Sequence, residues 1–198
     1  MRILLLALSC VTAAARADVP ASCPAALRCT QLKARLATCR RELAARKATL
    51  ERKSEPRPDE VTLEKTIADL KGLSRCTQCA GRLRSEAHML EAGTEGLLAN
   101  YYDSWGMKKG EDGRRSFRAM QEATRSDPQN LSAWTSYGKS LVAVDGRVTR
   151  GRIASYMGIN LPSEIRRAAD NLRRLLPAAP PSSDEAKAVL ASLDQIGK

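Results

Sequence analysis

The fold is decided by residues 116–141, SFRAMQEATRSDPQNLSAWTSYGKSL, near the middle of a chain of 198 residues. Small and apolar residues recur there at helical spacing on both sides of Asp127-Pro128, where proline resists helical continuation. Asn130 then supplies the polar residue that commonly precedes a helix. The spaced residues are Ser116, Met120 and Ala123 before the break, and Trp134, Tyr137, Gly138 and Leu141 after it. The stretch therefore predicts a helix, a tight turn and a second helix.

The order of these residues resembles the junction between two tetratricopeptide (TPR) repeats. A small, a large and a small residue are followed by Pro128, and then by Trp134 and Gly138. In the family's repeat of about 34 residues, small residues let two helices approach, an aromatic residue wedges between repeats, and proline ends the second helix. The resemblance implies an all-α chain in which residues 93–198 form a short TPR-like α-solenoid with a C-terminal capping helix.

The resemblance also implies a protein-binding scaffold whose concave surface comes from the first helix of each repeat. The lysines on that surface would receive an acidic side chain or a peptide's terminal carboxylate, and the aromatic residues would pack an apolar one. The candidate peptide-binding residues are Tyr101, Trp105, Lys108, Ser132, Thr135 and Lys139. Packing between helices is the alternative role for the aromatic residues, and simple solvation is the alternative for the lysines.

Further helix boundaries follow from local signals in this region. We expect a helix over residues 93–107, a turn at residues 109–113 and a helix ending at Pro128. After irregular residues 147–157, Ser163 is expected to cap a helix with an apolar face. A last helix, residues 186–196, is expected to present Val189 and Leu193 inward.

Residues 1–17 read as a secretory signal peptide. Arg2 precedes an apolar run, and Ala15-Arg16-Ala17 has the small residues of a cleavage site. The sequence around Cys10 also resembles a lipobox, so a lipoprotein is the less favoured alternative. We therefore expect an exported protein, periplasmic or secreted, without a transmembrane segment, because no apolar run approaches about 20 residues.

Residues 18–92 predict an antiparallel, coiled-coil-like helical hairpin. The first arm has apolar residues at alternating steps of three and four, and residues 54–59, with two prolines, break it. The second arm continues to about Leu90, with a kink at Gly72. The seam of the first arm is formed by Cys29, Leu32, Leu36, Cys39, Leu43 and Leu50. Pairing within one chain and pairing between chains, which would give a homo-oligomer, both fit this pattern.

Five cysteines follow the signal peptide, and in an exported protein they are expected to form structural disulfides. The disulfide candidates are Cys23, Cys29, Cys39, Cys76 and Cys79. Folding the hairpin back at Pro56–Pro58 sets Cys39 opposite Cys76 or Cys79. We favour Cys39 with Cys76, and Cys79 with Cys29 or Cys23, which leaves one thiol over.

The motif Cys76-Thr77-Gln78-Cys79 has other interpretations. A redox-active pair would make the chain a periplasmic thiol-disulfide protein, although no strand precedes the motif. Haem attachment needs a histidine where Ala80 stands. A zinc site could combine Cys39, Cys76, Cys79 and His88, although no second pair of matching spacing is present.

The formal net charge of +11, which is +9 without Arg2 and Arg16 of the signal peptide, favours anionic partners such as an acidic protein or peptide. Binding to an envelope polyanion, with an affinity that falls steeply with salt, is a further alternative. Acidic residues are interleaved with the basic ones, and we expect no nucleic acid. Nucleophile, zinc-protease and phosphate-loop motifs are absent from the sequence. The sequence thus predicts a non-enzymatic interaction scaffold or adaptor of the bacterial cell envelope, without metal or cofactor, and a thiol-disulfide protein is the alternative.

Overall fold

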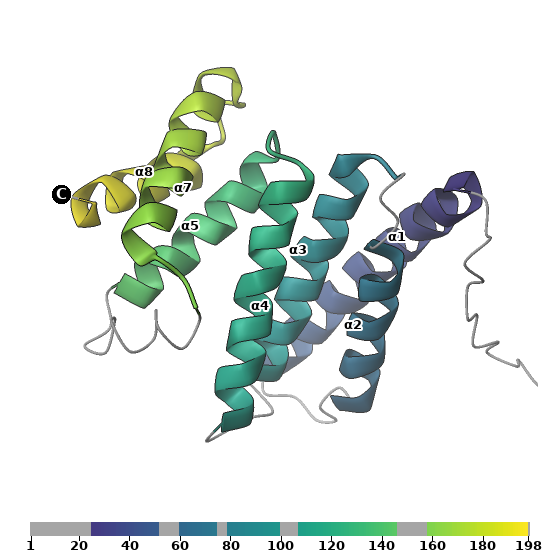
Figure 1. Ribbon diagram of the computed structural model, residues 1–198. Coiled ribbons are helices and arrows are strands. Elements are labelled where there is room, and N and C mark those ends of the chain that lie inside the picture. The colour runs from purple at the N-terminus through teal and green to yellow at the C-terminus, as the bar shows by residue number, and fades with distance from the viewer. Residues whose placement is uncertain (1–24, 52–59, 75–78, 100–106, 146–157, 198) are drawn as a thin grey trace, which may run out of the picture.

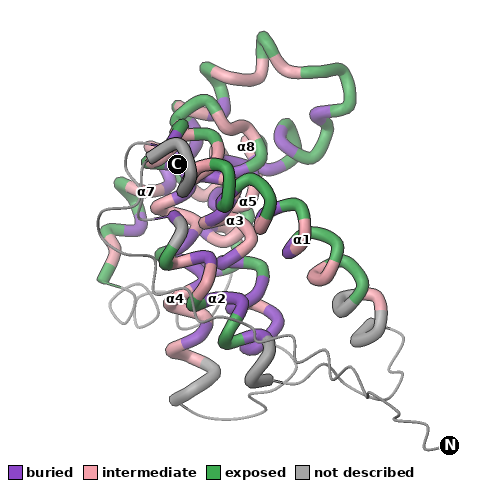
Figure 2. Tube along the Cα trace, turned by 90° about the vertical axis from the view of Figure 1, so that its right-hand side faces the viewer, coloured by how far each residue is buried: buried purple, intermediate pink, exposed green. Residues whose placement is uncertain are grey.

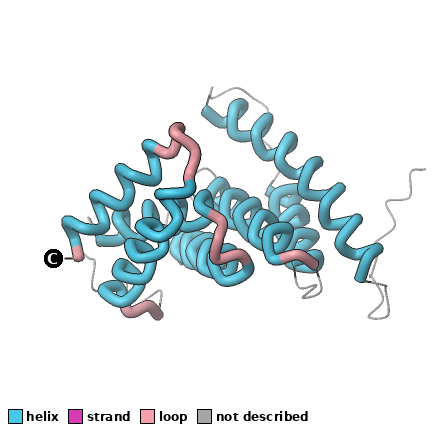
Figure 3. Tube along the Cα trace, turned by 90° about the horizontal axis from the view of Figure 1, so that it is seen from above, coloured by secondary structure: helices cyan, strands magenta, loops and turns pink. Residues whose placement is uncertain are grey.

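The computed structural model describes residues 25–51, 60–74, 79–99, 107–145 and 158–197 (Figure 1). In chain order the helices are α1 (Ala25–Glu51), α2 (Glu60–Ser74), α3 (Gly81–Leu97), α4 (Met107–Ser126), α5 (Leu131–Asp145), α7 (Leu161–Leu175), η2 (Leu176–Ala178) and α8 (Asp184–Ile196). No strand occurs within these residues (Figure 3). The predicted all-α class is confirmed, while the predicted signal peptide lies outside the described residues.

The helices follow one another across the molecule, from α1 and α2 at one side to α7 and α8 at the other (Figure 1). Helix α3 packs against α1, α2 and α4, and α5 packs against α4, α7 and α8. Buried residues gather on the inner sides of these helices, whereas the outer side of α1 is exposed (Figure 2). The two halves of the chain therefore meet through α4 and the turn that follows it.

The predicted helix break at Asp127-Pro128 is confirmed, since α4 ends and α5 begins on its two sides. Asp127 Oδ1 accepts a hydrogen bond from Gln129 N at 3.0 Å, which closes a local turn. Asn130 Oδ1 accepts a hydrogen bond from Ala133 N at 3.1 Å and caps α5. Both ends of the break are thus fixed by side chains that lie within it.

The predicted turn at residues 109–113 is wrong, because α4 runs through it. The two glycines there disfavour a helix by roughly 1 kcal/mol each. Against this, Glu111 pairs with Arg114 and Asp112 pairs with Arg115, each one helical turn apart. Asp112 is 0% exposed, so its charge is paired inside the protein only while this turn is helical. The buried ion pair explains why the helix prevails over the local composition.

The expected second arm of the hairpin is divided into α2 and α3. Gly72 lies inside α2 and does not divide the arm, and Cys79 and Ala80 are not helical just before α3 begins. Arg35 of α1 pairs with Asp69 of α2 at 2.9 Å, so these helices lie side by side. The predicted domain boundary between residues 92 and 93 falls within α3, which contacts helices on both sides of it.

Helices α3 and α4 approach each other closely where α3 begins. A Cβ atom on Gly81 would collide with the carbonyl oxygen of Ser126, so only glycine fits there without a shift of the backbone. Farther along, Ser116 Oγ donates a hydrogen bond to Ala92 O at 2.8 Å, as a short side chain permits. A glycine and a short serine side chain therefore permit the close spacing of this helix pair.

The apolar core of the C-terminal half lies between α5, α7 and α8. Its fully buried members are Tyr137, Leu141, Ala168, Leu172 and Leu193. The hydroxyl of Tyr137 donates a hydrogen bond to Glu164 Oε2 at 2.6 Å and accepts one from Gln121 Nε2 at 3.0 Å. Burial, assisted by the Glu164 carboxylate, raises the pKa of Tyr137 above its usual value. The hydroxyl therefore remains a donor throughout the ordinary pH range.

The apolar faces expected for the last two helices are confirmed, since Ile165, Val189 and Leu193 are buried. The start of α7 differs from the expectation. Asn160 Oδ1 accepts a hydrogen bond from Ser163 N at 3.1 Å, so Asn160 caps the helix and Ser163 lies inside it. Asn160 rather than Ser163 is the cap because Pro162 lies in the first turn of the helix, where its missing N–H has no carbonyl partner to lose.

The contact between α5 and α8 can be tested at Gly138. A Cβ atom there would come within 2.6 Å of Val189 Cγ1. We expect Gly138→Ala to lower the free energy of unfolding by about 1–3 kcal/mol through overpacking, measured by urea denaturation. Gly113→Ala is the control, since Gly113 is helical with open space around it and the change should add about 0.5–1 kcal/mol. Equal effects of the two changes would contradict the close approach.

Candidate functional site

An open groove of about 680 Å³ lies beside the turn that joins α4 to α5, and we call it the turn groove. Residues of α1 and α3 form one wall, and the turn and the first residues of α5 form the other. The lining residues are Arg40, Arg82, Glu86, Met89, Leu90, Asp127, Gln129, Asn130, Leu131 and Ser132. Ligand sites commonly span roughly 300–1,000 Å³, so the groove has the size of a binding site.

The wall formed by the turn is tied to its surroundings. Asn130 Nδ2 donates a hydrogen bond to Oγ of the buried Ser85 on α3 at 2.9 Å. The carbonyl oxygen of Pro128 accepts hydrogen bonds from Trp134 Nε1 and from Arg174 Nη2, both at 3.0 Å. Because α3, α5 and α7 all hold this short segment, the turn presents a fixed surface to the groove.

The groove combines apolar and polar side chains. Met89, Leu90 and Leu131 are half-buried and offer apolar surface. Gln129 and Ser132 are exposed, and their amide and hydroxyl groups can donate and accept hydrogen bonds. This mixture is typical of surfaces that bind a peptide, since the side chains of the peptide pack against the apolar area and its main chain forms hydrogen bonds with the polar groups.

Two arginines share one carboxylate on the helical wall of the groove. Arg40 Nη2 lies 2.7 Å from Glu86 Oε2, whereas Arg82 Nε lies 3.4 Å from Glu86 Oε1. The side chain of Arg82 is 82% exposed, and that of Glu86 is 23% exposed. Arg82 is thus the more weakly held of the two cations and the one that reaches farther into solvent.

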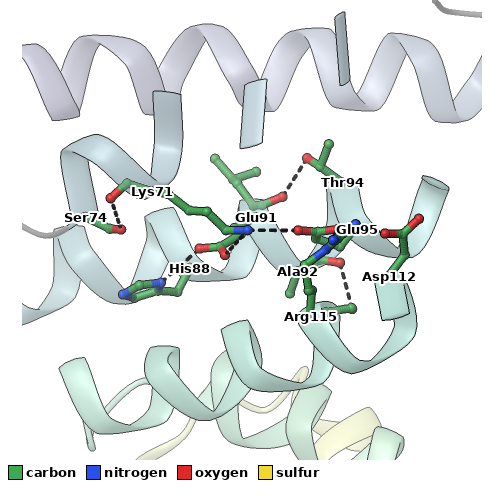
Figure 4. A network of polar contacts seen from close by, with 11 residues as sticks. Lys71, Ser74, His88, Glu91, Ala92, Thr94, Glu95, Asp112 and Arg115 are labelled. Carbon is green, nitrogen blue, oxygen red and sulfur yellow. Dashed lines mark hydrogen bonds and ion pairs between the residues drawn. The ribbon is translucent and has the colours of Figure 1, made fainter. Parts of the chain in front are cut away.

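Behind this wall a chain of ionic groups connects α2, α3 and α4 (Figure 4). In order of contact it comprises His88, Glu91, Lys71, Glu95, Arg115 and Asp112, and we call it the ionic chain. Lys71 Nζ lies 3.1 Å from Glu95 Oε1 and 3.5 Å from Glu91 Oε1. On the other side, Arg115 Nε donates a hydrogen bond to Glu95 Oε2 at 3.1 Å. Cations from two helices therefore hold one carboxylate of α3.

The ionic chain is a buried support for α3. Glu95 is 1% exposed and Glu91 is 6% exposed, and an unpaired charge at such depth would be strongly unfavourable. Asp112 Oδ2 is buried without a hydrogen-bond partner, so the charge of Asp112 depends on Arg115. No group of His, Cys, Asp and Glu in the described ranges is arranged to hold a metal ion. The arrangement therefore holds α2, α3 and α4 together.

Three of the predicted peptide-binding residues lie on α5. Ser132 lines the turn groove and is exposed. Thr135 is buried, and its hydroxyl donates a hydrogen bond to Leu131 O at 2.8 Å. Lys139 is exposed and pairs with Glu185 of α8 at 2.6 Å, away from the groove. Tyr101 and Trp105 lie outside the described residues, as does the side chain of Lys108 in the first turn of α4.

Arg40, Arg82 and Met89 line the groove although none of them was a candidate from the sequence. They belong to the part of the chain interpreted as a separate hairpin, where charged and apolar residues alternate as on any amphipathic helix. Only the contact between α3 and the turn identifies them as groove residues. The hydrogen bond from Asn130 to Ser85 joins residues far apart in the sequence, which no local pattern reveals.

A disulfide joins Cys29 of α1 to Cys79, with the Cα atoms 5.3 Å apart. This is one of the two pairings expected for Cys79, and Cys39 is buried in the same apolar cluster. Cys23 and Cys76 lie outside the described residues, so the pairing of Cys39 with Cys76 stays a prediction. The bond occupies the Cys79 sulfur that the alternative zinc site would require.

Comparison of the chain with family models, with curated proteins and with solved structures gives no match. Among the described helices, none combines the length and the apolar character needed to cross a bilayer.

The support given by the ionic chain can be tested at its centre. We expect Glu95→Gln to lower the free energy of unfolding by about 1–3 kcal/mol, because Lys71 and Arg115 lose a shared buried anion but are partly exposed and keep Glu91 and Asp112 as partners. Urea denaturation followed by circular dichroism measures the change. Glu64→Gln, at an exposed position of the neighbouring α2, is the control and should alter stability by less than about 0.5 kcal/mol. A similarly small effect at Glu95 would show that the buried pairs contribute little.

The disulfide can be identified by non-reducing tryptic mapping of the exported protein. We expect residues 29–33 (CTQLK) to be recovered linked to residues 76–82 (CTQCAGR), with fragmentation locating the bond at Cys79. Recovery of a closed Cys76–Cys79 loop, with Cys29 alkylated, would contradict the observed pairing.

Proposed function

We propose that the chain is an exported, non-enzymatic adaptor of the bacterial cell envelope that binds a peptide segment of a partner protein in the turn groove. The observation that carries this proposal is an open groove that exposes apolar surface of Met89, Leu90 and Leu131. One wall of this groove is formed by α1 and α3, and the other by the turn and the start of α5. An enclosed cavity would suit a small molecule, whereas an open groove admits a segment whose chain continues at both ends.

The resemblance to TPR repeats supports the adaptor class, and we regard residues 93–198 as a divergent array of this kind. The binding surface that we assign differs from the concave face of the family. It shares Ser132 with that face and adds residues of α1 and α3. This choice follows from the burial of Thr135 and the pairing of Lys139 with Glu185, which leave the predicted face with fewer available groups.

Export rests on the signal-like residues 1–17 and is consistent with the Cys29–Cys79 disulfide, since such bonds persist in oxidising compartments. The alternative function, thiol-disulfide exchange by Cys76 and Cys79, needs the Cys79 sulfur to be available to Cys76. Its bond to Cys29, 50 residues away, speaks for a structural role and for the adaptor.

Selection from a random 12-residue peptide library tests the proposal. We expect the full chain to enrich defined sequences and Ser132→Trp to abolish their binding, because the indole would fill the groove at an exposed position where folding tolerates it. Fluorescence anisotropy of the enriched peptides gives the dissociation constants, and circular dichroism checks that the variant is folded.

Ser182→Trp is the matched control, since Ser182 is exposed in the loop before α8 and does not line the groove. It should bind the enriched peptides as the unchanged chain does. Peptides that bind Ser132→Trp and Ser182→Trp equally well would refute the turn groove as the binding site.

A further inference from the structure

Resting on that proposed function, we propose that the turn groove selects a peptide segment in which an Asp or Glu adjoins a large apolar residue, with Arg82 as the residue that reads the carboxylate. This inference names the chemistry of the partner segment and assigns a specificity role to one side chain.

The helical wall of the groove carries an excess of positive charge. Arg40 and Arg82 carry two positive charges there, and Glu86 supplies one negative charge between them. Arg40 meets Glu86 at 2.7 Å, the length of a strong charge-assisted hydrogen bond, and so satisfies the carboxylate. The 3.4 Å contact of Arg82 is longer than such bonds usually are. One cation of this wall is therefore left in surplus.

The guanidinium of Arg82 is available to bind a second carboxylate. A guanidinium has five N–H donors in a planar fork that matches a carboxylate bidentately. Arg82 uses one donor in its long contact with Glu86, and its side chain is 82% exposed. A second carboxylate entering the groove would meet this fork without displacing a strong ion pair.

The opposite wall fixes the orientation of the segment. Asp127 is its negative residue, and Asp127 Oδ1 already accepts a hydrogen bond from Gln129 N. A carboxylate of the partner would be repelled by Asp127 and attracted by Arg82, so it lies toward α3. The residue beside it then reaches Met89, Leu90 and Leu131, whose half-buried surface an apolar side chain of Leu or Phe size would cover.

The net charge of the chain agrees with this choice. Without residues 1–17, which carry Arg2 and Arg16 and no acidic residue, the formal charge is 11 − 2 = +9. This charge raises the local concentration of acidic segments and speeds their association, and salt screens the effect. Arg82 adds to this general attraction a preference for a carboxylate at one position of the peptide.

Three fluorescein-labelled 12-residue peptides test the inference, identical except that the position before a central Leu-Leu pair is Glu, Gln or Lys. By anisotropy at low salt, the full chain should bind the Glu peptide about fivefold more tightly than the Gln peptide, as a well-oriented ion pair of an exposed arginine provides. The Lys peptide should bind most weakly.

Two variants assign the preference to Arg82. Arg82→Gln should reduce the preference for Glu over Gln to less than about twofold, and Arg82→Glu should reverse it in favour of Lys. Arg118→Gln removes an exposed arginine of α4 outside the groove and should keep the preference. Arg82→Gln and Arg118→Gln each lower the net charge by one unit, so comparing these two variants separates local recognition from general attraction.

Equal binding of the three peptides by the unchanged chain would overturn the inference and leave peptide binding in the groove intact. A preference for Glu that survives in Arg82→Gln would also overturn it, by assigning the effect to net charge. Failure of the proposed function looks different, because binding of library peptides would then not respond to Ser132→Trp.

Discussion

The position of α3 depends on a carboxylate that has almost no contact with water. Glu95 is held by Lys71 from α2 and Arg115 from α4, and an unpaired anion at 1% exposure would not be stable. The charge of Glu95 is therefore fully compensated only when α2 and α4 are both packed against α3. Because α3 also carries Arg82, Glu86 and Met89, the same requirement positions one wall of the turn groove.

The other wall has a different physical origin. The turn between α4 and α5 is fixed by hydrogen bonds to main-chain and amide groups, and by the apolar core beneath Trp134 and Tyr137. Arg167 lies 5.5 Å from the centres of both of these rings, so a cation of α7 covers the aromatic pair from α5. An aromatic core thus supports the turn, whereas the ionic chain supports α3, so the two walls of the groove depend on different interactions.

Sequence reasoning succeeded where the deciding forces are local. Proline and its neighbouring polar residues fix the break between α4 and α5 within a few positions of chain, and the apolar spacing of α8 needs no partner to be recognised. It was wrong at residues 109–113, where two glycines suggest a turn but the burial of Asp112 with Arg115 requires a helix. The groove residues Arg40 and Arg82 escaped notice for the same reason. Their role arises from the packing of α3 against a turn that is distant in the sequence. Among the residues that line the groove, Ser132 alone was a candidate binding residue from the sequence.

The missing side chain at Gly81 has a consequence for how such a groove can change. Because the first residue of α3 rests directly against the end of α4, the distance between the two walls is set by backbone atoms. Side chains such as Arg82, Gln129 and Ser132 point from these walls into solvent and take little part in holding them apart. Substitution at those positions can thus alter what is recognised while the scaffold stays as it is. The atoms that set the distance between the walls are therefore different from the side chains that would contact a ligand.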